Sequence, residues 1–387
     1  MLPGRATARG IAIAALVSAE AGARANLELP RLLAESGLDQ RDRAFATELT
    51  YGTLRMLRAC DWLVGQFARG DLEPEVRAAA RAGAYQIVYM RVPAYAAVSA
   101  TVAECPPRAR SLLNAVLRRV ADLVEAGPVR WPGPGTKLSY PDWVLRRLGE
   151  DLGPDRAQGA LEQMNEAATV AVRADGYTQD PASQAVAEHM AGLMAQGPGG
   201  PALDLCAAPG GKATALAAAT PMVVAADVAF ERAALVAGNV ARLHLANVAV
   251  VVADATEPPF RSARFAGVLV DAPCSGLGVL RRRPDARWRV RPEDVGRLAA
   301  LQRRLLSAAI PLVAPGGVLV YSVCTLTRAE TVDVDQWLAE LLPAASGWHA
   351  EEEPPVGLPW EPSGRGWLLL PQGAGTDGMY MLALRRH

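Results

Sequence analysis

The stretch that decides the fold is Leu203-Asp204-Leu205-Cys206-Ala207-Ala208-Pro209-Gly210-Gly211-Lys212. A short apolar run ends in a glycine-rich turn, and an apolar helical segment through Leu216 follows. Glycines let the backbone approach a ligand closely, and the helix N-terminus behind them favours anionic groups. The turn differs from GxGxxG, and Pro209 disfavours a dinucleotide-binding turn. The pattern predicts a strand, a ligand-binding turn and a helix.

Further apolar runs follow this stretch, and most of them end at an aspartate or a cysteine. They lack the alternation of half-exposed strands, which is typical of strands covered by helices on both faces. The sequence therefore predicts an α/β doubly wound, Rossmann-like sheet, whose ligands bind at the carboxyl ends of the strands. The predicted strands are 222–226 before Asp227, 248–252 before Asp254, 267–270 before Asp271 and 317–321 before Cys324, with 367–370 and 379–384 closing the sheet.

Three of these aspartates favour a nucleoside cofactor. Asp227 is placed to accept hydrogen bonds from ribose hydroxyls, and Asp254 to meet the adenine side. The alternative interpretation is that the aspartates only cap helices. The residues predicted to hold the cofactor are Cys206, Ala207, Ala208, Pro209, Gly210, Gly211, Lys212, Asp227, Asp254 and Asp271.

Two cysteines come directly after predicted strands, Cys274 in Asp271-Ala272-Pro273-Cys274-Ser275-Gly276 and Cys324 in Ser322-Val323-Cys324-Thr325. A single cysteine there would be a small buried apolar residue. If the two strands are neighbours, however, both thiols face one crevice. Carbon 5 of cytosine is too electron-poor to attack a methyl sulfonium, and addition of a thiolate to carbon 6 makes it nucleophilic. A group such as Asp271, holding a proton at the ring nitrogen, would help that addition. The residues alone do not choose between the two thiols.

The N-terminal part has a different organisation. Residues 1–125 carry apolar positions at helical spacing without strand-like alternation, and a Pro/Gly-rich linker follows at 127–135. We expect a helical domain over 1–125, a linker and short subdomain over 126–180, and the α/β domain over 181–387. The run 11–17 is too short for a membrane span, and we interpret it as an amphipathic helix of a cytosolic protein rather than a signal peptide.

Composition limits the partners. The chain has 40 Lys and Arg against 40 Asp and Glu, so any binding of RNA must come from a local patch. Its five cysteines form no CxxC pair and its four histidines are scattered, which supports no metal site. The candidate patch follows the Asp271 strand, where arginines suit phosphates and the tryptophan suits a base; the alternative is a solvated loop. The RNA-binding candidates are Arg281, Arg282, Arg283, Arg287 and Trp288.

The motifs together resemble those of the Sun (Nop) family of RNA cytosine-5 methyltransferases. The likeness rests on 203–212, on Asp-Ala-Pro-Cys-Ser at 271–275 and on the Cys324 strand end. The N-terminal half resembles the NusB-like RNA-binding domain of the RsmB branch, through the segments 42–44, 48–55, 93–98 and 114–118.

This resemblance implies S-adenosylmethionine as the cofactor and 16S ribosomal RNA as the substrate. It also implies that Cys324 is the nucleophile and that Cys274 assists product release. The chain departs from the family pattern at Val323, at Thr331 and in a shortened segment between Arg173 and Gln179. Two alternatives stay open: an RNA-binding protein with degenerate catalysis, and a cytosine methyltransferase acting on another RNA such as tRNA.

Overall fold

The computed structural model describes residues 6–387, which fall into two units. One unit comprises the chain up to Leu145 together with Leu280–Arg289, and the other comprises Arg146–Val279 and Val290–His387. Residues 1–5 of the predicted helical domain lie outside the described residues. In the part of the chain that the structure describes, no helix has the length and apolar character needed to cross a bilayer.

The first unit is helical, as predicted from the sequence. It contains α1 (Ala8–Glu20), α2 (Ala25–Ser36), α3 (Gln40–Arg55), α4 (Leu57–Gly65), α5 (Pro74–Val88), α6 (Ala94–Ala103), a 3-10 turn (Pro107–Ala109), α7 (Arg110–Glu125), α8 (Pro134–Lys137) and α14 (Ala286–Arg289). The helix α9 (Asp142–Leu152) contains the boundary between the units.

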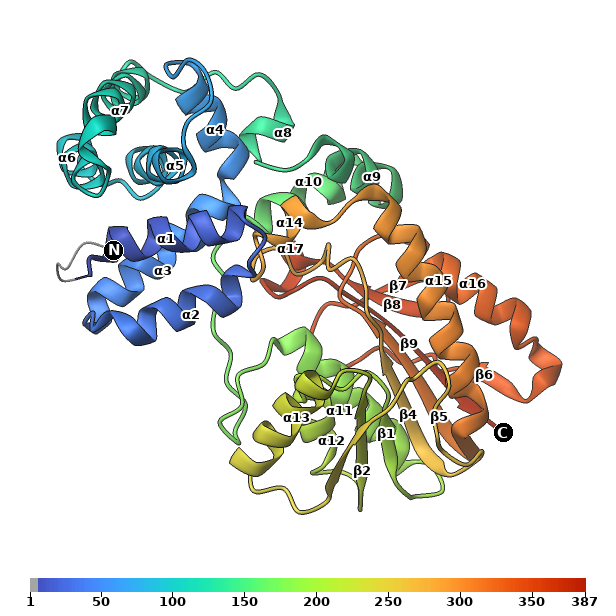
Figure 1. The fold of residues 1–387 in the computed structure, drawn as a ribbon. Helices are drawn as coiled ribbons and strands as arrows, with labels where there is room; N and C mark the ends of the chain where they lie inside the picture. The colour runs from blue at the N-terminus through green and yellow to red at the C-terminus, as the bar shows by residue number, and fades with distance from the viewer. Residues whose placement is uncertain (1–5) are drawn as a thin grey trace. The chain divides into compact units, whose positions relative to one another are not determined.

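The helix α5 is the centre of this unit, packed against α1, α3, α4, α6 and α7 (Figure 1). Many of its buried positions are small, including Ala78, Ala79 and Ala82. Small side chains on every side let neighbouring helices approach, which explains how one helix is enclosed by five others. The predicted N-terminal helix is confirmed as α1, which buries Ile11, Ile13 and Leu16 in the unit.

The second unit is the predicted doubly wound sheet. Its helices are α10 (Pro154–Gln163), α11 (Pro181–Ala195), α12 (Gly211–Leu216), α13 (Phe230–Arg242), α15 (Pro292–Ala309), α16 (Val332–Leu341) and α17 (Pro371–Ala374), with 3-10 turns at Ile310–Leu312, Arg328–Glu330 and Ala344–Ser346. Its strands are β1 (Ala202–Asp204), β2 (Val223–Asp227), β3 (Val248–Val252), β4 (Phe265–Asp271), β5 (Val313–Val323), β6 (Trp348–Ala350), β7 (Glu361–Ser363), β8 (Gly366–Leu369) and β9 (Met379–Arg386).

The strands lie in the order β3-β2-β1-β4-β5-β9-β8-β7, and β6 pairs with β9. β1 to β5 run parallel, whereas β9 is antiparallel to β5. The strand order therefore reverses at β1 and β4, and the carboxyl ends of these two strands flank the crevice in which ligands of such sheets bind.

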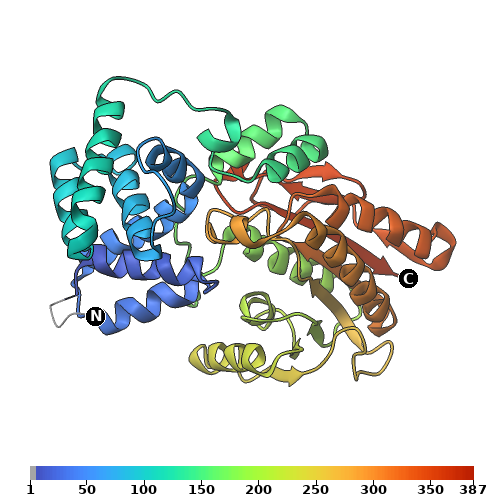
Figure 2. The same ribbon diagram turned by 45° about the horizontal axis from the view of Figure 1, so that its top comes forward.

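Helices cover both faces of the central strands (Figure 2). A Cβ on Gly267 of β4 would lie 2.4 Å from the Met194 sulfur of α11, so this glycine faces α11. Tyr321 of β5 pairs with Val270, three positions along β4 and hence on the opposite face, and its hydroxyl donates to Gln302 of α15 at 2.9 Å. Burial on both faces explains why these strands read as continuous apolar runs.

Candidate active site

The two thiols predicted to share a crevice lie side by side. β4 and β5 are parallel neighbours, with Asp271 paired to Ser322, so the segments that follow them leave the sheet together. The sulfurs of Cys274 and Cys324 are 3.2 Å apart, and both side chains are half-buried. The backbone N–H of Gly278 also donates to the carbonyl oxygen of Cys324 at 3.0 Å. The strands are neighbours, as the prediction required, and they bring the two sulfurs together.

The surroundings of Cys274 act on the protonation of its thiol. The hydrogen bond with Cys324 and burial raise the pKa of the Cys274 thiol well above its usual value. Cys274 therefore keeps its proton at neutral pH and can donate it in a hydrogen bond to the neighbouring sulfur. A thiol that acts as donor stabilises the thiolate form of its partner.

An ion pair between a buried lysine and a half-buried aspartate joins the glycine-rich turn to the end of β4. The Lys212 ammonium lies 2.7 Å from Oδ2 of Asp271, and Ser322 donates to Oδ1 of the same carboxylate at 2.7 Å. Burial lowers the pKa of Lys212, but Asp271 and then Cys324 outweigh it, so that the pKa is raised overall. Lys212 therefore stays charged near the Cys324 sulfur, where a cation favours a thiolate.

The turn after β1 has the backbone that its glycines predicted. Gly210 has a φ of 105°, in the left-handed region where side chains are strained. A Cβ on Gly210 would also lie 3.2 Å from Val236 of α13. The turn is held to β2 because Ala207 donates to the carbonyl of Ala226 at 2.9 Å. α12 begins directly after it, at Gly211.

A pocket of about 290 Å³ lies at the carboxyl ends of β1, β2 and β3. Buried Asp227 and exposed Asp254 both line it, as does Cys206. Asp227 accepts hydrogen bonds from the N–H groups of Ala208 and Ala229 at 3.3 and 3.2 Å, which orient its carboxylate. The pocket thus offers two carboxylates for hydroxyl and amino donors within an apolar wall, which fits a nucleoside. The pocket is lined by Leu205, Cys206, Asp227, Val228, Arg232, Asp254, Ala255, Thr256, Pro273, Leu301, Arg304 and Leu305.

Asp204, at the end of β1, belongs to the same area but was not among the predicted site residues. It is 1% exposed, and one of its oxygens has no hydrogen-bond partner among the described residues. Burial, and then the nearby charge of Asp271, raise the pKa of Asp204 to about 7. The sequence could have predicted Asp204 from its position, because it ends a strand just as Asp227 and Asp271 do.

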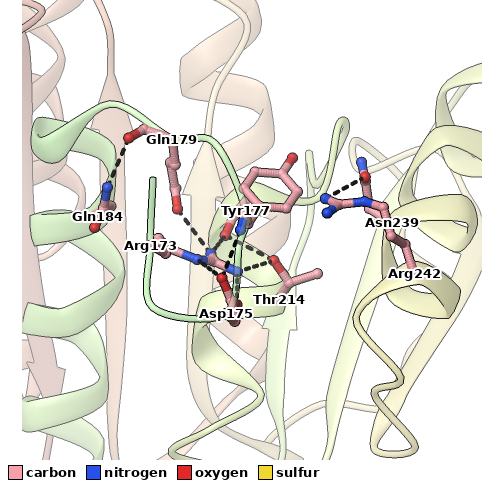
Figure 3. A network of polar contacts seen from close by, with 9 residues as sticks. Arg173, Asp175, Tyr177, Gln179, Gln184, Thr214, Asn239 and Arg242 are labelled. Carbon is pink, nitrogen blue, oxygen red and sulfur yellow. Dashed lines mark hydrogen bonds and ion pairs between the residues drawn. The ribbon is translucent and has the colours of Figure 1, made fainter. Parts of the chain in front are cut away.

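The shortened segment before the sheet, residues 172–179, packs against the end of the glycine-rich turn and the start of α12 (Figure 3). Val172 and Thr178 make a single antiparallel bridge. Between them, Arg173 donates to the carbonyl of Gly211 at 2.6 Å and to the Thr214 hydroxyl at 3.0 Å, and its guanidinium lies 4.7 Å from the Tyr177 ring centroid. The remaining short segment therefore supports the first turn of α12.

The structure contradicts the prediction of RNA contact for Arg287, whereas for Trp288, which is half-buried, that contact stays a prediction. Arg287 is 0% exposed, its guanidinium lies 3.8 Å from the Tyr140 ring centroid, and it donates to the carbonyl of Arg55 at 3.1 Å. The Trp288 indole donates to the carbonyl of Leu54 at 2.9 Å. Both side chains take part in the packing of the helical unit, because they donate hydrogen bonds to backbone carbonyls near the end of α3.

The other three arginines of the predicted RNA-binding patch differ in their exposure to solvent. Arg281 is buried, Arg282 is half-buried and Arg283 is exposed. Of the predicted patch, Arg283 is the side chain that solvent, and hence a phosphate, can reach most freely.

The doubly wound sheet, with a pocket at the carboxyl ends of its strands and two thiols at neighbouring strand ends, is compatible with a methyltransferase that uses S-adenosylmethionine, and the family models show this class. The sequence model of the family described as 16S rRNA methyltransferase RsmB/F matches residues 192–385, and that of the NusB family matches residues 6–122. The chain belongs to the RsmB/F family of RNA methyltransferases and carries an N-terminal NusB-type domain.

Curated relatives match over almost the whole chain. A putative methyltransferase of Mycobacterium tuberculosis is 36% identical, over 94% of this chain and 93% of the relative. The ribosomal RNA small subunit methyltransferase B of Thermus thermophilus is 37% identical over 98% of each chain. The alignment with the mycobacterial protein spans 437 positions, more than the 387 residues here, so that relative contains segments that this chain lacks.

Solved structures agree with the fold. The crystal structure of PH0851 matches 98% of this chain and 99% of its own, with a TM-score of 0.77 at 20% identity. A methyltransferase homologue from Pyrococcus horikoshii matches 65% of this chain with a TM-score of 0.51 at 21% identity.

Proposed function

We propose that this protein methylates carbon 5 of a cytosine in 16S ribosomal RNA through a covalent adduct with Cys324. The observation that carries the proposal is the pair of sulfurs 3.2 Å apart, at the carboxyl ends of β4 and β5 and beside the nucleoside pocket. The family description and the name of the Thermus thermophilus relative support ribosomal RNA of the small subunit as the substrate.

The chemistry assigns a different task to each thiol. The Cys324 thiolate forms a bond to carbon 6 of the ring, and the displaced electron pair makes carbon 5 nucleophilic. S-adenosylmethionine, when bound, supplies the methyl group that carbon 5 attacks. A base then takes the carbon 5 proton, and the electrons of that C–H bond restore the double bond between carbons 5 and 6. The bond between carbon 6 and sulfur breaks, and its electrons return to Cys324. Cys274, which holds its proton beside that sulfur, assists the release.

Local charge favours Cys324 as the nucleophile. The charged Lys212 ammonium acts on Cys324, and the Cys274 thiol is positioned to donate to its sulfur. A nearby cation and a neighbouring donor are typical surroundings of a nucleophilic cysteine. Asp271, oriented by Lys212 and Ser322, is the group that would hold a proton at the ring nitrogen while carbon 6 is attacked.

The pocket fits S-adenosylmethionine by its donor and acceptor set. Asp227 and Asp254 offer carboxylate oxygens to the ribose and adenine ends, and Cys206, the first residue of the turn at 206–212, lines the same pocket. The buried Asp204 oxygen that lacks a partner among the described residues is an acceptor available to an ammonium group.

The test is methyl transfer from labelled S-adenosylmethionine to ribosomal RNA isolated from cells that lack this protein. We expect the label in 16S RNA, and we expect mapping to find it as 5-methylcytosine. Label in another modified base would contradict the chemistry, and label in tRNA instead would contradict the substrate. Absence of transfer to any RNA while the cofactor still binds would overturn the proposal in favour of a degenerate RNA-binding protein.

A further inference from the structure

A buried carboxylate links the two segments that carry the thiols. Glu330 lies in the 3-10 turn after β5 and is 0% exposed. Its Oε1 accepts from the N–H of Ser275 at 2.8 Å and from the amide of Gln302 at 3.1 Å. Its Oε2 accepts from the hydroxyls of Ser275, Thr325 and Thr327 at 2.5, 3.1 and 2.8 Å.

These donors come from both sides of the thiol pair. Ser275 is adjacent to Cys274 in the chain, and Thr325 is adjacent to Cys324. Their hydroxyl oxygens lie 2.8 Å from each other as well as within hydrogen-bond distance of Glu330. Both segments lie beyond the paired part of β4 and β5, which ends at Asp271 and Ser322, so strand pairing does not fix their separation.

Only an acceptor with several lone pairs can satisfy this set of donors. A carboxylate offers two oxygens with about four lone-pair sites, whereas an amide presents two N–H donors in place of one of those oxygens. The backbone N–H of Ser275 cannot reverse its role, as a hydroxyl can. Replacing Glu330 by glutamine therefore disrupts the link although the shape of the side chain is nearly kept.

We propose that Glu330 is a positioning residue that holds Cys274 and Cys324 at their working separation. Its role in catalysis rests on the proposed cysteine mechanism, but its role in setting the distance between the sulfurs does not. The effect of Glu330 on the distance between the sulfurs can be measured without RNA or cofactor, because two thiols held this close form a disulfide readily.

The measurement is the equilibrium of the full-length protein with oxidised and reduced glutathione. The thiols of Cys274 and Cys324 lose two protons and two electrons to form one S–S bond, and one oxidised glutathione accepts them to give two reduced molecules. Mass spectrometry of peptides quantifies the Cys274–Cys324 link and separates it from any other cysteine product. The equilibrium constant reports how closely the protein holds the two sulfurs.

A second buried carboxylate provides a matched control. Asp335 in α16 is 2% exposed and accepts from the N–H of Arg365 at 2.7 Å. The bonds found for Asp335 run to Arg365 and not to the segments that carry the thiols. Glu330→Gln and Asp335→Asn therefore both neutralise a buried carboxylate, and only the first acts on the thiol pair.

We expect Glu330→Gln to lower the disulfide equilibrium constant by roughly tenfold and Asp335→Asn to leave it near the wild-type value. Thr325→Val, which removes one donor and keeps the shape, is expected to lower it by a smaller factor, and it replaces Glu330→Gln if that variant does not fold. In methyl transfer, kcat of Glu330→Gln falls while KM for S-adenosylmethionine is unchanged.

Some outcomes would overturn the proposal. One is a wild-type equilibrium constant in folded Glu330→Gln or Thr325→Val, and another is an equal loss in Asp335→Asn. If the wild-type protein transfers no methyl group, the proposed function fails, while the glutathione measurement still decides whether Glu330 sets the separation of the sulfurs.

Discussion

Lys212 and Asp271 are predictable one at a time, but their pairing is not. Both residues stand at positions where a strand or a glycine-rich turn ends, so the sequence alone assigns them to the crevice. Their contact of 2.7 Å depends on the strand order, which brings the turn after β1 beside the end of β4. Sequence patterns report periodicity along the chain and carry no information on which strand ends become neighbours.

Arg287 shows the opposite case, in which the pattern misleads. A run of arginines predicts a charged surface, whereas burial of one of them depends on carbonyls and a ring supplied by distant segments. The ring of Tyr140 and the carbonyl of Arg55 provide that environment, and burial lowers the pKa of Arg287 to about 10. The prediction of RNA contact was wrong for this residue because charge and position along the chain do not report burial.

Asp204 gives a prediction at the scale of a single residue. Its pKa of about 7 in the folded protein lies above the usual 3.8, so the folded state binds a proton more tightly than the unfolded chain. Its contribution to stability is therefore fully present below pH 3.8 and is lost as the pH rises through 7. As the pH rises from 3.8 to 7, the free energy of unfolding of the wild-type protein should therefore fall relative to that of Asp204→Asn. The expected fall is at most roughly 4 kcal/mol.

The measurement is urea unfolding of both proteins at several pH values from 4 to 8. Asp254→Asn serves as the control, because Asp254 is exposed and its pKa is lowered by hydrogen bonds from Thr256. A difference between the wild-type protein and Asp204→Asn that does not change with pH would contradict the raised pKa.

At the scale of elements, the long strands and helices were predictable and the short edge strands were not. The runs predicted at 248–252 and 379–384 correspond to β3 and β9. Buried β9 carries the continuous apolar sequence of a covered strand, and β3 carries it although it is only half-buried. By contrast β7 has three residues, two of them exposed, and gives no such signal. It pairs with β8 around the turn at Gly364, whose φ is 64°.

The crossing of α3 and α5 supplies a prediction at this scale. A Cβ on Gly52 would lie 2.1 Å from the ring of Tyr85, whose hydroxyl donates to Glu48 at 2.6 Å. Gly52→Ala forces the two helices apart and is expected to lower the free energy of unfolding by about 1–3 kcal/mol. Gly65→Ala is the control, because a Cβ on Gly65 at the end of α4 meets nothing within 4 Å. Calorimetric unfolding of both variants measures the difference, and equal stability would refute the close approach.

At the scale of the whole molecule, the net charge of zero means that any phosphate contact has to be local. Arg283 is the exposed residue of the predicted patch, and we propose that it contacts an RNA phosphate. Arg283→Ala should then weaken binding to all RNA sequences and reduce the slope of log affinity against log salt by about one.

Arg261 is the matched control for this effect. It is also exposed, but it precedes β4 and so lies at the amino end of that strand, away from the crevice. Titrations of RNA at several salt concentrations measure both slopes. An unchanged slope in Arg283→Ala, or an equal reduction in Arg261→Ala, would argue against a phosphate contact at Arg283.

The fold class and the presence of two thiols in one crevice were predictable because strand periodicity and strand-end residues encode them. The separate roles of Cys274 and Cys324 were not, because both thiols end neighbouring strands and only their surroundings distinguish them. The roles proposed for them rest on the buried Cys274 thiol and on the Lys212 ammonium, which lie together only in the folded chain.

The most direct test of the central claim is mass spectrometry of each cysteine variant after incubation with S-adenosylmethionine and undermethylated 16S RNA. Cys274→Ala retains the nucleophile and lacks the thiol that assists release, so it should accumulate a covalent complex between RNA and protein at Cys324. Cys324→Ala should form no such complex. A complex in Cys324→Ala through Cys274, with none in Cys274→Ala, would reverse the two roles and contradict this account.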